Sequence, residues 1–279
     1  MKLASYAIAG AQTYGAVDGA FVSDLGAVLG TRYPTLRDAI GSGQLNAARA
    51  VTAPVHSLSA VTLLPPITNP DKIVCIGLNY RAHAAEAGLA VPEFPALFLR
   101  LTNTLVPHFG SLIVPSVSGD FDFEGELALV IGKGGRHIRR DRALGHVFGY
   151  ACFNDASVRD YQFKHCLTVG KNFPATGGFG PWIATADEIP DPASLTLVTR
   201  LNEHEVQRGP LNDLIFDIPA IIEYVSTFTE LAPGDVISTG TPHGVGLGRK
   251  PPLWMKPGDT IEVEVSGIGV LRNRVVAEA

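Results

Sequence analysis

The stretch DFDFEGELALVIG, residues 120–132, joins an acidic half to an apolar half. Polar and apolar residues alternate through its first part, and a strand turns every second side chain to the same face. Asp122, Glu124 and Glu126 would therefore project together. The apolar run over residues 127–131 is typical of a buried core strand. We predict one strand here that begins with clustered carboxylates and ends inside the core.

Clustered carboxylates on a strand that enters the core point to a bound cation. Like charges on one face repel, and burying a carboxylate without a partner is costly, so such a cluster usually surrounds a cation. A further acidic candidate, Asp155, lies in GYACFNDASVRDYQ, residues 149–162. Hard oxygen ligands without cysteine or a close histidine indicate magnesium, manganese or calcium rather than zinc. A solvated strand face is the alternative interpretation.

The composition indicates a compact soluble protein and argues against several classes of partner. Of the 279 residues, 46% are hydrophobic and 18% are charged, and the net charge is -5 with basic residues scattered along the chain. Because no basic stripe stands out, we expect neither nucleic acid nor an anionic membrane as a partner. Three cysteines without CxxC spacing predict no disulfide framework and no thiolate zinc site. The first residues lack the continuous apolar segment of a signal peptide or membrane helix, so we expect a cytoplasmic location.

Strand patterns dominate the chain from residue 71 onward. The predicted strands are Lys72–Ile76, Ala96–Leu99, Glu124–Ile131, Gly149–Asn154, Leu195–Asn202, Asp235–Ser238 and Thr260–Val265. The predicted helices are Tyr80–Ala87, Ala156–Phe163 and Ile218–Phe228. Since strands and helices do not alternate strictly, a doubly wound nucleotide fold is disfavoured. We predict an α+β, β-rich fold with peripheral helices.

The first part of the chain reads as a small separate unit. Its predicted elements are strands near Ala4–Ala9 and Gly15–Val22 and helices over Thr35–Ile40 and Leu45–Val51. Prolines then punctuate a connecting stretch, and each disfavours helix at the preceding residue. We therefore predict a small N-terminal domain over residues 1–68 and a catalytic domain over residues 69–279.

Two basic side chains stand out as candidates for chemistry. His83 and Glu86 are three residues apart on a predicted helix, so the carboxylate can orient the imidazole as a general base that activates water. Lys171 lies between a glycine and an asparagine followed by phenylalanine, and a lysine screened from water could stabilise an enolate or carboxylate oxygen. A surface ion pair and a solvated lysine are the respective alternatives.

A glycine-rich loop follows the strand in PGDVISTGTPHGVG, residues 233–246. Glycine lets backbone N–H groups approach an anion, and the Thr241 hydroxyl can donate to a carboxylate. The loop is not a phosphate loop, because it has no GK[ST] sequence and no helix follows. A plain hairpin connection is the alternative.

Together these segments resemble the fumarylacetoacetate hydrolase family over about residues 70–277. The matching segments are, in order, IGLNYRAHAAEAG, FEGELALVIG, NDASVRDYQ, VGKNF, GPW, LIFDIPAIIEYVS, LAPGDVISTGTPHGVG and MKPGDTIEVEVSGIGVLRN. The resemblance implies the mixed β-sandwich or β-roll of that family's C-terminal domain. It also implies that residues 1–68 are the small, variable N-terminal domain that many members carry.

Carried over residue by residue, the resemblance implies a complete active site. It makes Glu124, Glu126 and Asp155 the ligands of Mg²⁺, with Mn²⁺ and then Ca²⁺ as alternatives. His83 and Glu86 become the base and its orienting acid on a mobile lid segment, and Lys171 faces the metal-bound oxygens of the substrate. Asp122 lies beside the ligands without being one. The implied substrate contacts are Arg100, Gln162, Thr241 and Tyr80.

The resemblance implies hydrolysis of a carbon–carbon bond in a β-diketo, acylpyruvate-type acid through a metal-bound enolate. Isomerisation or decarboxylation of a 2-hydroxy-dienedioate or 2-oxo acid in aromatic catabolism is the alternative, and a non-catalytic carboxylate-binding protein is a second one. We expect a small 2-oxo or dicarboxylic acid as substrate and a homodimer as the assembly. Arg100 where many relatives have lysine, and Pro174 where they have aspartate, bear on the substrate rather than on the chemistry.

Overall fold

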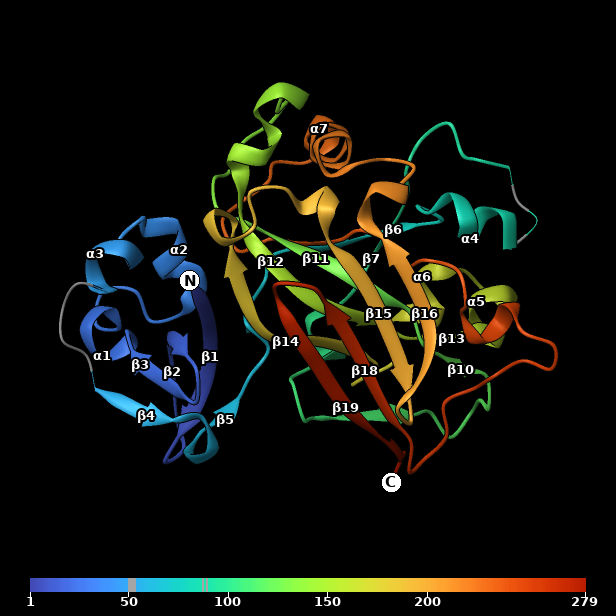
Figure 1. Cartoon of the computed structure of the whole chain (residues 1–279), viewed down its shortest axis with the longest axis horizontal. Coiled ribbons are helices and arrows are strands. Elements are labelled where there is room, and N and C mark those ends of the chain that lie inside the picture. The colour runs from blue at the N-terminus through green and yellow to red at the C-terminus, as the bar shows by residue number, and fades with distance from the viewer. Residues whose placement is uncertain (50–53, 87, 89) are drawn as a thin grey trace.

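The computed structural model describes residues 1–49, 54–86, 88 and 90–279, and a large mixed sheet runs through it (Figure 1). The order of its main path is β4 (Val55–Ser57), β3 (Phe21–Asp24), β2 (Ala11–Asp18), β1 (Lys2–Ile8), β14 (Gly177–Thr185), β12 (Val147–Asp155), β11 (Gly125–Ile131), β17 (Val236–Ser238), β6 (Ile73–Gly77) and β7 (Ala96–Leu99). Two short strands, β5 (Thr62–Leu63) and β8 (Leu105–Val106), pair with β1 and β14.

A second sheet packs across one face of the first. Its order is β16 (His204–Pro210), β15 (Thr196–Leu201), β18 (Thr260–Val265), β19 (Gly269–Ala277) and β9 (Ser111–Val114). Strands β15, β18 and β19 contact β11, β12 and β14 of the main sheet. A separate two-stranded ribbon pairs β10 (Phe121–Asp122) with β13 (Ser157–Val158). The part of the chain that carries β11, β12 and β14 is therefore a sandwich of two sheets.

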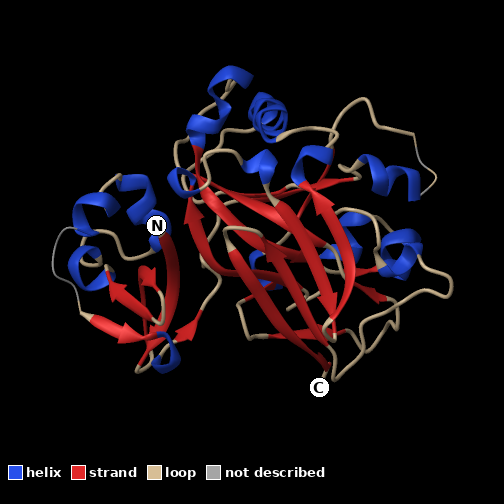
Figure 2. Cartoon of the chain, viewed as in Figure 1, coloured by secondary structure: helices blue, strands red, loops and turns tan. Residues whose placement is uncertain are grey.

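The helices lie around the sheets rather than between their strands (Figure 2). They are α1 (Gly26–Leu29), α2 (Leu36–Ser42), α3 (Leu45–Arg49), α4 (Arg81–Glu86), α5 (Arg159–Lys164), α6 (Leu167–Lys171) and α7 (Ile218–Phe228). Asp217 caps α7, with its side chain accepting the Ala220 N–H. No helix in the described ranges is long and apolar enough to cross a membrane.

Strand β11 shows how the alternation of the sequence builds the core. Leu127, Leu129 and Ile131 belong to the apolar cluster that includes side chains of β15, β18 and β19. Ala128 and Val130 belong to the opposite cluster, which α2 and the N-terminal strands also enter. Side chains two residues apart share a face, so the side chains of the even-numbered residues of β11 lie on the face opposite the second sheet. Glu124 and Glu126 continue that even-numbered series.

The predicted α+β, β-rich fold is confirmed, and each predicted strand after residue 71 has a counterpart. The predicted strand Gly15–Val22 is wrong, because it merges the end of β2 with the start of β3 across a turn where Gly19 has a left-handed φ of 55°. The helix predicted over Ala156–Phe163 begins later, at Arg159, because β13 takes the preceding residues. Residues 50 and 51 of the helix predicted over Leu45–Val51, and residue 87 of the one predicted over Tyr80–Ala87, lie outside the described residues.

Strands β1–β5 and helices α1–α3 form an N-terminal lobe, and the short pairing of β1 with β14 connects the strands of this lobe to the rest of the main sheet. Lys2 and Leu3 of β1 pair with Ala184 and Ile183 of β14. The lobe, blue in Figure 1, otherwise stands to one side of the sandwich. The predicted boundary after residue 68 falls between β5 and β6, and it stays a prediction because the two parts share a sheet.

Shortening Leu271 tests the packing of the two sheets. This side chain of β19 is 1% exposed and belongs to the core cluster shared with the main sheet. Leu271→Ala should lower the free energy of unfolding by about 2–5 kcal/mol in a denaturant titration, through lost burial and a residual cavity. Leu144→Ala, at a 43% exposed position, should change it by no more than about 0.5 kcal/mol. Equal effects of the two changes would contradict the sandwich.

Candidate active site

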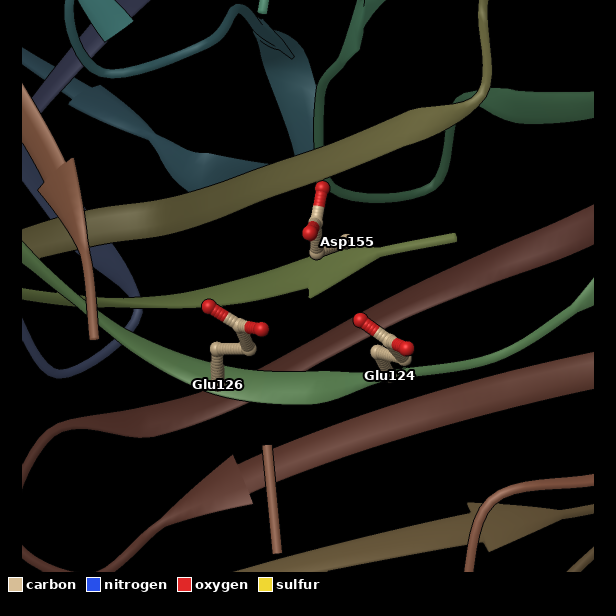
Figure 3. Close-up of side chains that lie close together, drawn as sticks. All are labelled: Glu124, Glu126 and Asp155. Carbon is tan, nitrogen blue, oxygen red and sulfur yellow. The ribbon is translucent and has the colours of Figure 1, made fainter. Parts of the chain in front are cut away.

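Three carboxylates converge at one end of the β11–β12 pair (Figure 3). Glu124 and Glu126 project from the same face because they are two residues apart on an extended segment. The Asp155 N–H donates to the Glu124 carbonyl at 2.8 Å, which places Asp155 directly opposite Glu124. One carboxylate oxygen from each residue lies within 4.8 Å of the other two. The antiparallel register thus assembles the acidic cluster that the sequence predicts.

The cluster is almost fully removed from solvent. Glu124 is 6%, Glu126 1% and Asp155 0% exposed. Carboxylates at these positions would be strongly destabilising without nearby positive charge. The neutralising groups come from segments that are distant in sequence from the strand carrying the two glutamates.

Lys171 at the end of α6 binds two of the three carboxylates. Its Nζ donates to Glu124 Oε2 at 2.5 Å, to Asp155 Oδ2 at 2.6 Å and to the Asp155 carbonyl at 2.9 Å. An ammonium group has three N–H donors, so all of them are engaged. In this arrangement Lys171 neutralises the cluster, and its predicted contact with substrate oxygens stays a prediction.

Arg159, which the sequence analysis missed, bridges the cluster to Asp122. Its guanidinium donates to Asp122 at 2.8 Å, to Glu124 Oε1 at 2.5 Å and to Gln162 at 3.0 Å. Arg159 is the first residue of α5, where the helix dipole disfavours a cation. An arginine near the start of a predicted helix was therefore a signal in the sequence that an acidic partner from another segment binds it.

Two predicted substrate contacts lie outside the cavity lining. Arg100 is 3% exposed, and its Nε donates to Asp155 while its other nitrogens contact the Ala156 carbonyl and Thr176. Tyr80 is fully buried, and its hydroxyl has no hydrogen-bond partner among the described residues. Contact of either side chain with substrate stays a prediction; in this structure Arg100 holds Asp155.

The acidic residues differ in how their charges are compensated. Although burial opposes ionisation of Glu124, Arg159 and Lys171 outweigh it and lower the pKa of Glu124 to about 2. Burial raises the pKa of Glu126 well above its usual range, and repulsion from Asp155 and Glu124 adds to the rise. Glu126 accepts from two neutral donors, the Ser238 hydroxyl at 2.5 Å and the Gly240 N–H at 2.9 Å.

This donor set fits a hard divalent cation. Four buried carboxyl groups, those of Asp122, Glu124, Glu126 and Asp155, face the three cations Arg100, Arg159 and Lys171, so the cluster carries one negative charge in excess when all four are ionised. Among the described residues Glu126 forms no ion pair with a cationic side chain, yet one of its carboxylate oxygens lies within 4.8 Å of an oxygen of Glu124 and one of Asp155. Oxygen donors of this kind suit Mg²⁺, Mn²⁺ or Ca²⁺.

His83 and Glu86 form a hydrogen-bonded pair on α4. His83 Nδ1 lies 3.1 Å from Glu86 Oε2, and the Gly244 N–H donates to Glu86 Oε1 at 2.9 Å. Partial burial opposes ionisation of Glu86, but the hydrogen bonds from His83 and Gly244 outweigh it and lower its pKa. An ionised carboxylate can only accept, so Nδ1 carries the hydrogen, and in the neutral imidazole this leaves the lone pair on Nε2. The pair therefore has the arrangement of an oriented general base.

A cavity of about 690 Å³ connects the base to the acidic cluster. Seven predicted site residues line it, namely His83, Glu86, Glu124, Glu126, Gln162, Lys171 and Thr241. Asp155 is fully buried and lies outside the lining, where Lys171 contacts its carboxylate. An apolar wall completes the cavity, formed by Ile76, Phe98, Phe163, Leu167, Val245 and Leu247.

Gln207 of the second sheet is a further residue that the sequence analysis missed. Its Oε1 accepts the Gly125 N–H at 3.0 Å, and its Nε2 donates to the Thr241 hydroxyl at 2.9 Å and the Pro242 carbonyl at 3.0 Å. Thr241 donates its own hydroxyl to the Gly125 carbonyl at 2.8 Å. This network fixes the residue between the two glutamates against the glycine-rich loop. The hydroxyl hydrogen of Thr241 is therefore already engaged in this structure. Its donation to a substrate carboxylate stays a prediction.

Replacing Glu126 by glutamine should stabilise the metal-free protein at neutral pH. A carboxyl whose pKa is raised on folding binds more protons in the folded state, so stability falls as pH rises from the unfolded pKa, about 4, toward the folded one. Glu126→Gln removes that loss, so the metal-free variant should melt at a higher temperature than the wild type at pH 7. In melting curves recorded across pH, the difference between the two proteins should vanish near pH 4. Added Mn²⁺ should raise the melting temperature of the wild type and not of the variant. A wild type that is the more stable protein without metal at pH 7 would refute this assignment.

Comparisons with known proteins agree with this fold. The fumarylacetoacetate hydrolase C-terminal family model matches residues 72–276. The mitochondrial oxaloacetate tautomerase of Homo sapiens is 40% identical over 242 residues, covering 85% of this chain and 77% of that protein. Two solved structures align over the full length of both chains. They are 5-carboxymethyl-2-hydroxymuconate delta-isomerase from Mycobacterium smegmatis (31% identity, TM-score 0.83) and maleylpyruvate hydrolase from Sphingobium sp. SYK-6 with manganese(II) and pyruvate (31% identity, TM-score 0.85).

The family match covers most of the chain, and it coincides with the sandwich that carries the three carboxylates and the His83–Glu86 pair. Relatives in this fold include hydrolases, isomerases and tautomerases. One of the hydrolases has been crystallised with a divalent metal ion and a 2-oxo acid. The chain belongs to the fumarylacetoacetate hydrolase family.

Proposed function

We propose that this protein is a metal-dependent hydrolase that cleaves a carbon–carbon bond in a β-diketo acid of the acylpyruvate type. The observation that carries the proposal is the oriented base His83–Glu86, which lines the same cavity as Glu124 and Glu126. Glu124, Glu126 and Asp155 would hold Mg²⁺ or Mn²⁺. When bound, the ion would supply Lewis acidity at the carboxylate and keto oxygens of the substrate.

His83 moves the proton in the proposed reaction. Its Nε2 takes a proton from water, and the hydroxide adds to the carbonyl that is distant from the carboxylate. The bond between that carbonyl carbon and the neighbouring methylene then breaks, and its electron pair passes into the enolate of the pyruvate part. The proton held on His83 returns to the methylene carbon. Water and substrate together thus yield pyruvate and a carboxylic acid.

The remaining residues orient the substrate and balance its charge. Lys171 and Arg159 lie in the lining and carry positive charge beside the carboxylates, which lowers the electrostatic cost of bringing an anionic substrate there. The apolar wall that includes Phe98, Leu167 and Val245 suits an acyl arm. A cavity of about 690 Å³ leaves space for such an arm in addition to the 2-oxo acid.

A tautomerase acting on oxaloacetate is the second candidate function. It is favoured by the 40% identity to the human oxaloacetate tautomerase over most of this chain. Here His83 would take the proton from the methylene carbon of the substrate, and no water would attack. An isomerase in aromatic catabolism draws support from the Mycobacterium smegmatis isomerase structure, whereas a decarboxylase rests on the family resemblance alone. A protein that binds carboxylates without turnover is the remaining alternative.

Several wider expectations rest on the sequence or the resemblance alone. They are a homodimeric assembly, a cytoplasmic location, and a small 2-oxo or dicarboxylic acid as partner rather than nucleic acid or membrane. Magnesium as the native ion also rests on the resemblance, whereas manganese draws support from the complex of the Sphingobium hydrolase.

A product assay separates these functions. With acetylpyruvate and Mn²⁺ or Mg²⁺, the proposed hydrolase should release pyruvate and acetate in equal amounts, and Glu126→Gln should abolish release while the protein stays folded. Oxaloacetate that interconverts between its keto and enol forms without fragments would favour the tautomerase, and carbon dioxide would indicate decarboxylation. Binding of oxalate with metal, but without turnover of any substrate, would leave only the non-catalytic alternative.

Removing the base should affect turnover far more than metal binding. His83→Ala should lower kcat by about 10²- to 10⁴-fold, the usual contribution of a positioned acid–base group. The affinity for Mn²⁺, measured by calorimetry, should stay close to that of the wild type because His83 is no ligand. His204→Ala, at an exposed histidine of β16, is the matched control and should leave both quantities unchanged. Undiminished kcat in His83→Ala would exclude the proposed role.

A further inference from the structure

The loop Gly244–Gly248 touches both halves of the candidate site. At one end, the Gly244 N–H donates to Glu86 Oε1 at 2.9 Å. In its middle, the N–H groups of Gly246 and Leu247 donate to the Asp122 carboxylate at 2.7 and 3.1 Å. The loop therefore has one set of contacts to the base pair and a second set to a buried carboxylate.

Asp122 continues this contact to the acidic cluster. It accepts a hydrogen bond from Arg159 at 2.8 Å, and Arg159 donates in turn to Glu124 at 2.5 Å. Asp122 is fully buried, so its contacts with the loop are shielded from water. An unbroken series of hydrogen bonds thus runs from Glu124 through Arg159 and Asp122 to the loop.

Gly248 packs directly against Glu86. A Cβ atom at position 248 would lie 2.7 Å from both Cδ and Oε1 of Glu86 and 3.0 Å from its Cγ. Gly248 ends a 3₁₀ turn, Gly246–Gly248, and its φ lies outside the left-handed region. Backbone conformation therefore does not demand glycine at this position, and the demand comes from the space that the Glu86 carboxylate occupies.

We propose that Gly248 is a positioning residue for the base, because its missing side chain leaves the space that holds Glu86 against Gly244 and in reach of His83. The inference rests on the proposed function, in which His83 is the base. Its consequence is that the loop sets where the base lies relative to the carboxylates, since Asp122 and Arg159 fix the same loop to Glu124. A methyl group at position 248 would displace a flexible side chain rather than backbone, so the fold should survive.

Gly248→Ala tests this directly. Displacement of Glu86 should lower kcat by about 10- to 100-fold, as expected when a positioned group moves by about 1 Å. Mn²⁺ affinity and melting temperature should stay near the wild-type values, because no ligand of the cluster is touched. Gly145→Ala is the matched control, since Gly145 also lies in a 3₁₀ helix, Arg140–His146, and a Cβ there meets nothing within 4 Å. The control should leave kcat unchanged.

A double-mutant cycle with Glu86→Ala decides whether Gly248 acts through Glu86. Without the Glu86 side chain there is nothing to displace, so Gly248→Ala should cause no further loss of kcat in that background. If Gly248→Ala unexpectedly lowered the melting temperature, Glu86→Ala should restore it for the same reason. An equal loss of kcat in both backgrounds would overturn the inference. Full activity of Glu86→Ala alone would instead refute the proposed base, which keeps the two failures distinguishable.

Discussion

The antiparallel register between β11 and β12 sets the geometry of the acidic cluster. It places Asp155 opposite Glu124 through the 2.8 Å backbone hydrogen bond, while the two-residue period puts Glu126 on the same face. A slip of one residue would turn the carboxylates toward the second sheet and the apolar side chains away from it. The apolar cores on both sides of β11 therefore fix the acidic cluster together with the fold.

Burial of that cluster explains much of the surrounding structure. Arg100, Arg159 and Lys171 come from three separate segments, and each donates to a carboxylate of the cluster or beside it. Gln207 crosses from the second sheet to bind the backbone between the two glutamates. Buried charge tolerates little error in the position of its partners, so these contacts also hold the cavity in shape. Four carboxyl groups face three cationic side chains, and we infer that a bound divalent cation balances the fourth, Glu126.

The sequence was informative where a local pattern carries the structure. Alternation predicted the carboxylates on one face of β11, and the capped apolar pattern predicted helix α7 with its observed bounds. Strand β14 has no counterpart among the predicted strands, because its first half is rich in glycine and contains a proline. Yet the strand needs glycine at position 178, because a Cβ there would lie 2.6 Å from Asn273 Oδ1 of the second sheet. No local sequence pattern reveals that close approach. The roles of Arg159 and Gln207 depend in the same way on distant partners, since Glu124 is 35 residues from Arg159 and Gly125 is 82 residues from Gln207.

We propose that carboxylates from the neighbouring β11 and β12 segments hold one divalent ion. Anomalous diffraction at the manganese edge, from crystals of this protein grown with Mn²⁺, tests it most directly. The account predicts a single peak in coordination range of Glu124, Glu126 and Asp155, with Lys171 withdrawn from at least one of the carboxylates that it contacts without metal. No peak between these side chains, or a peak bound elsewhere with the cluster unchanged, would contradict it.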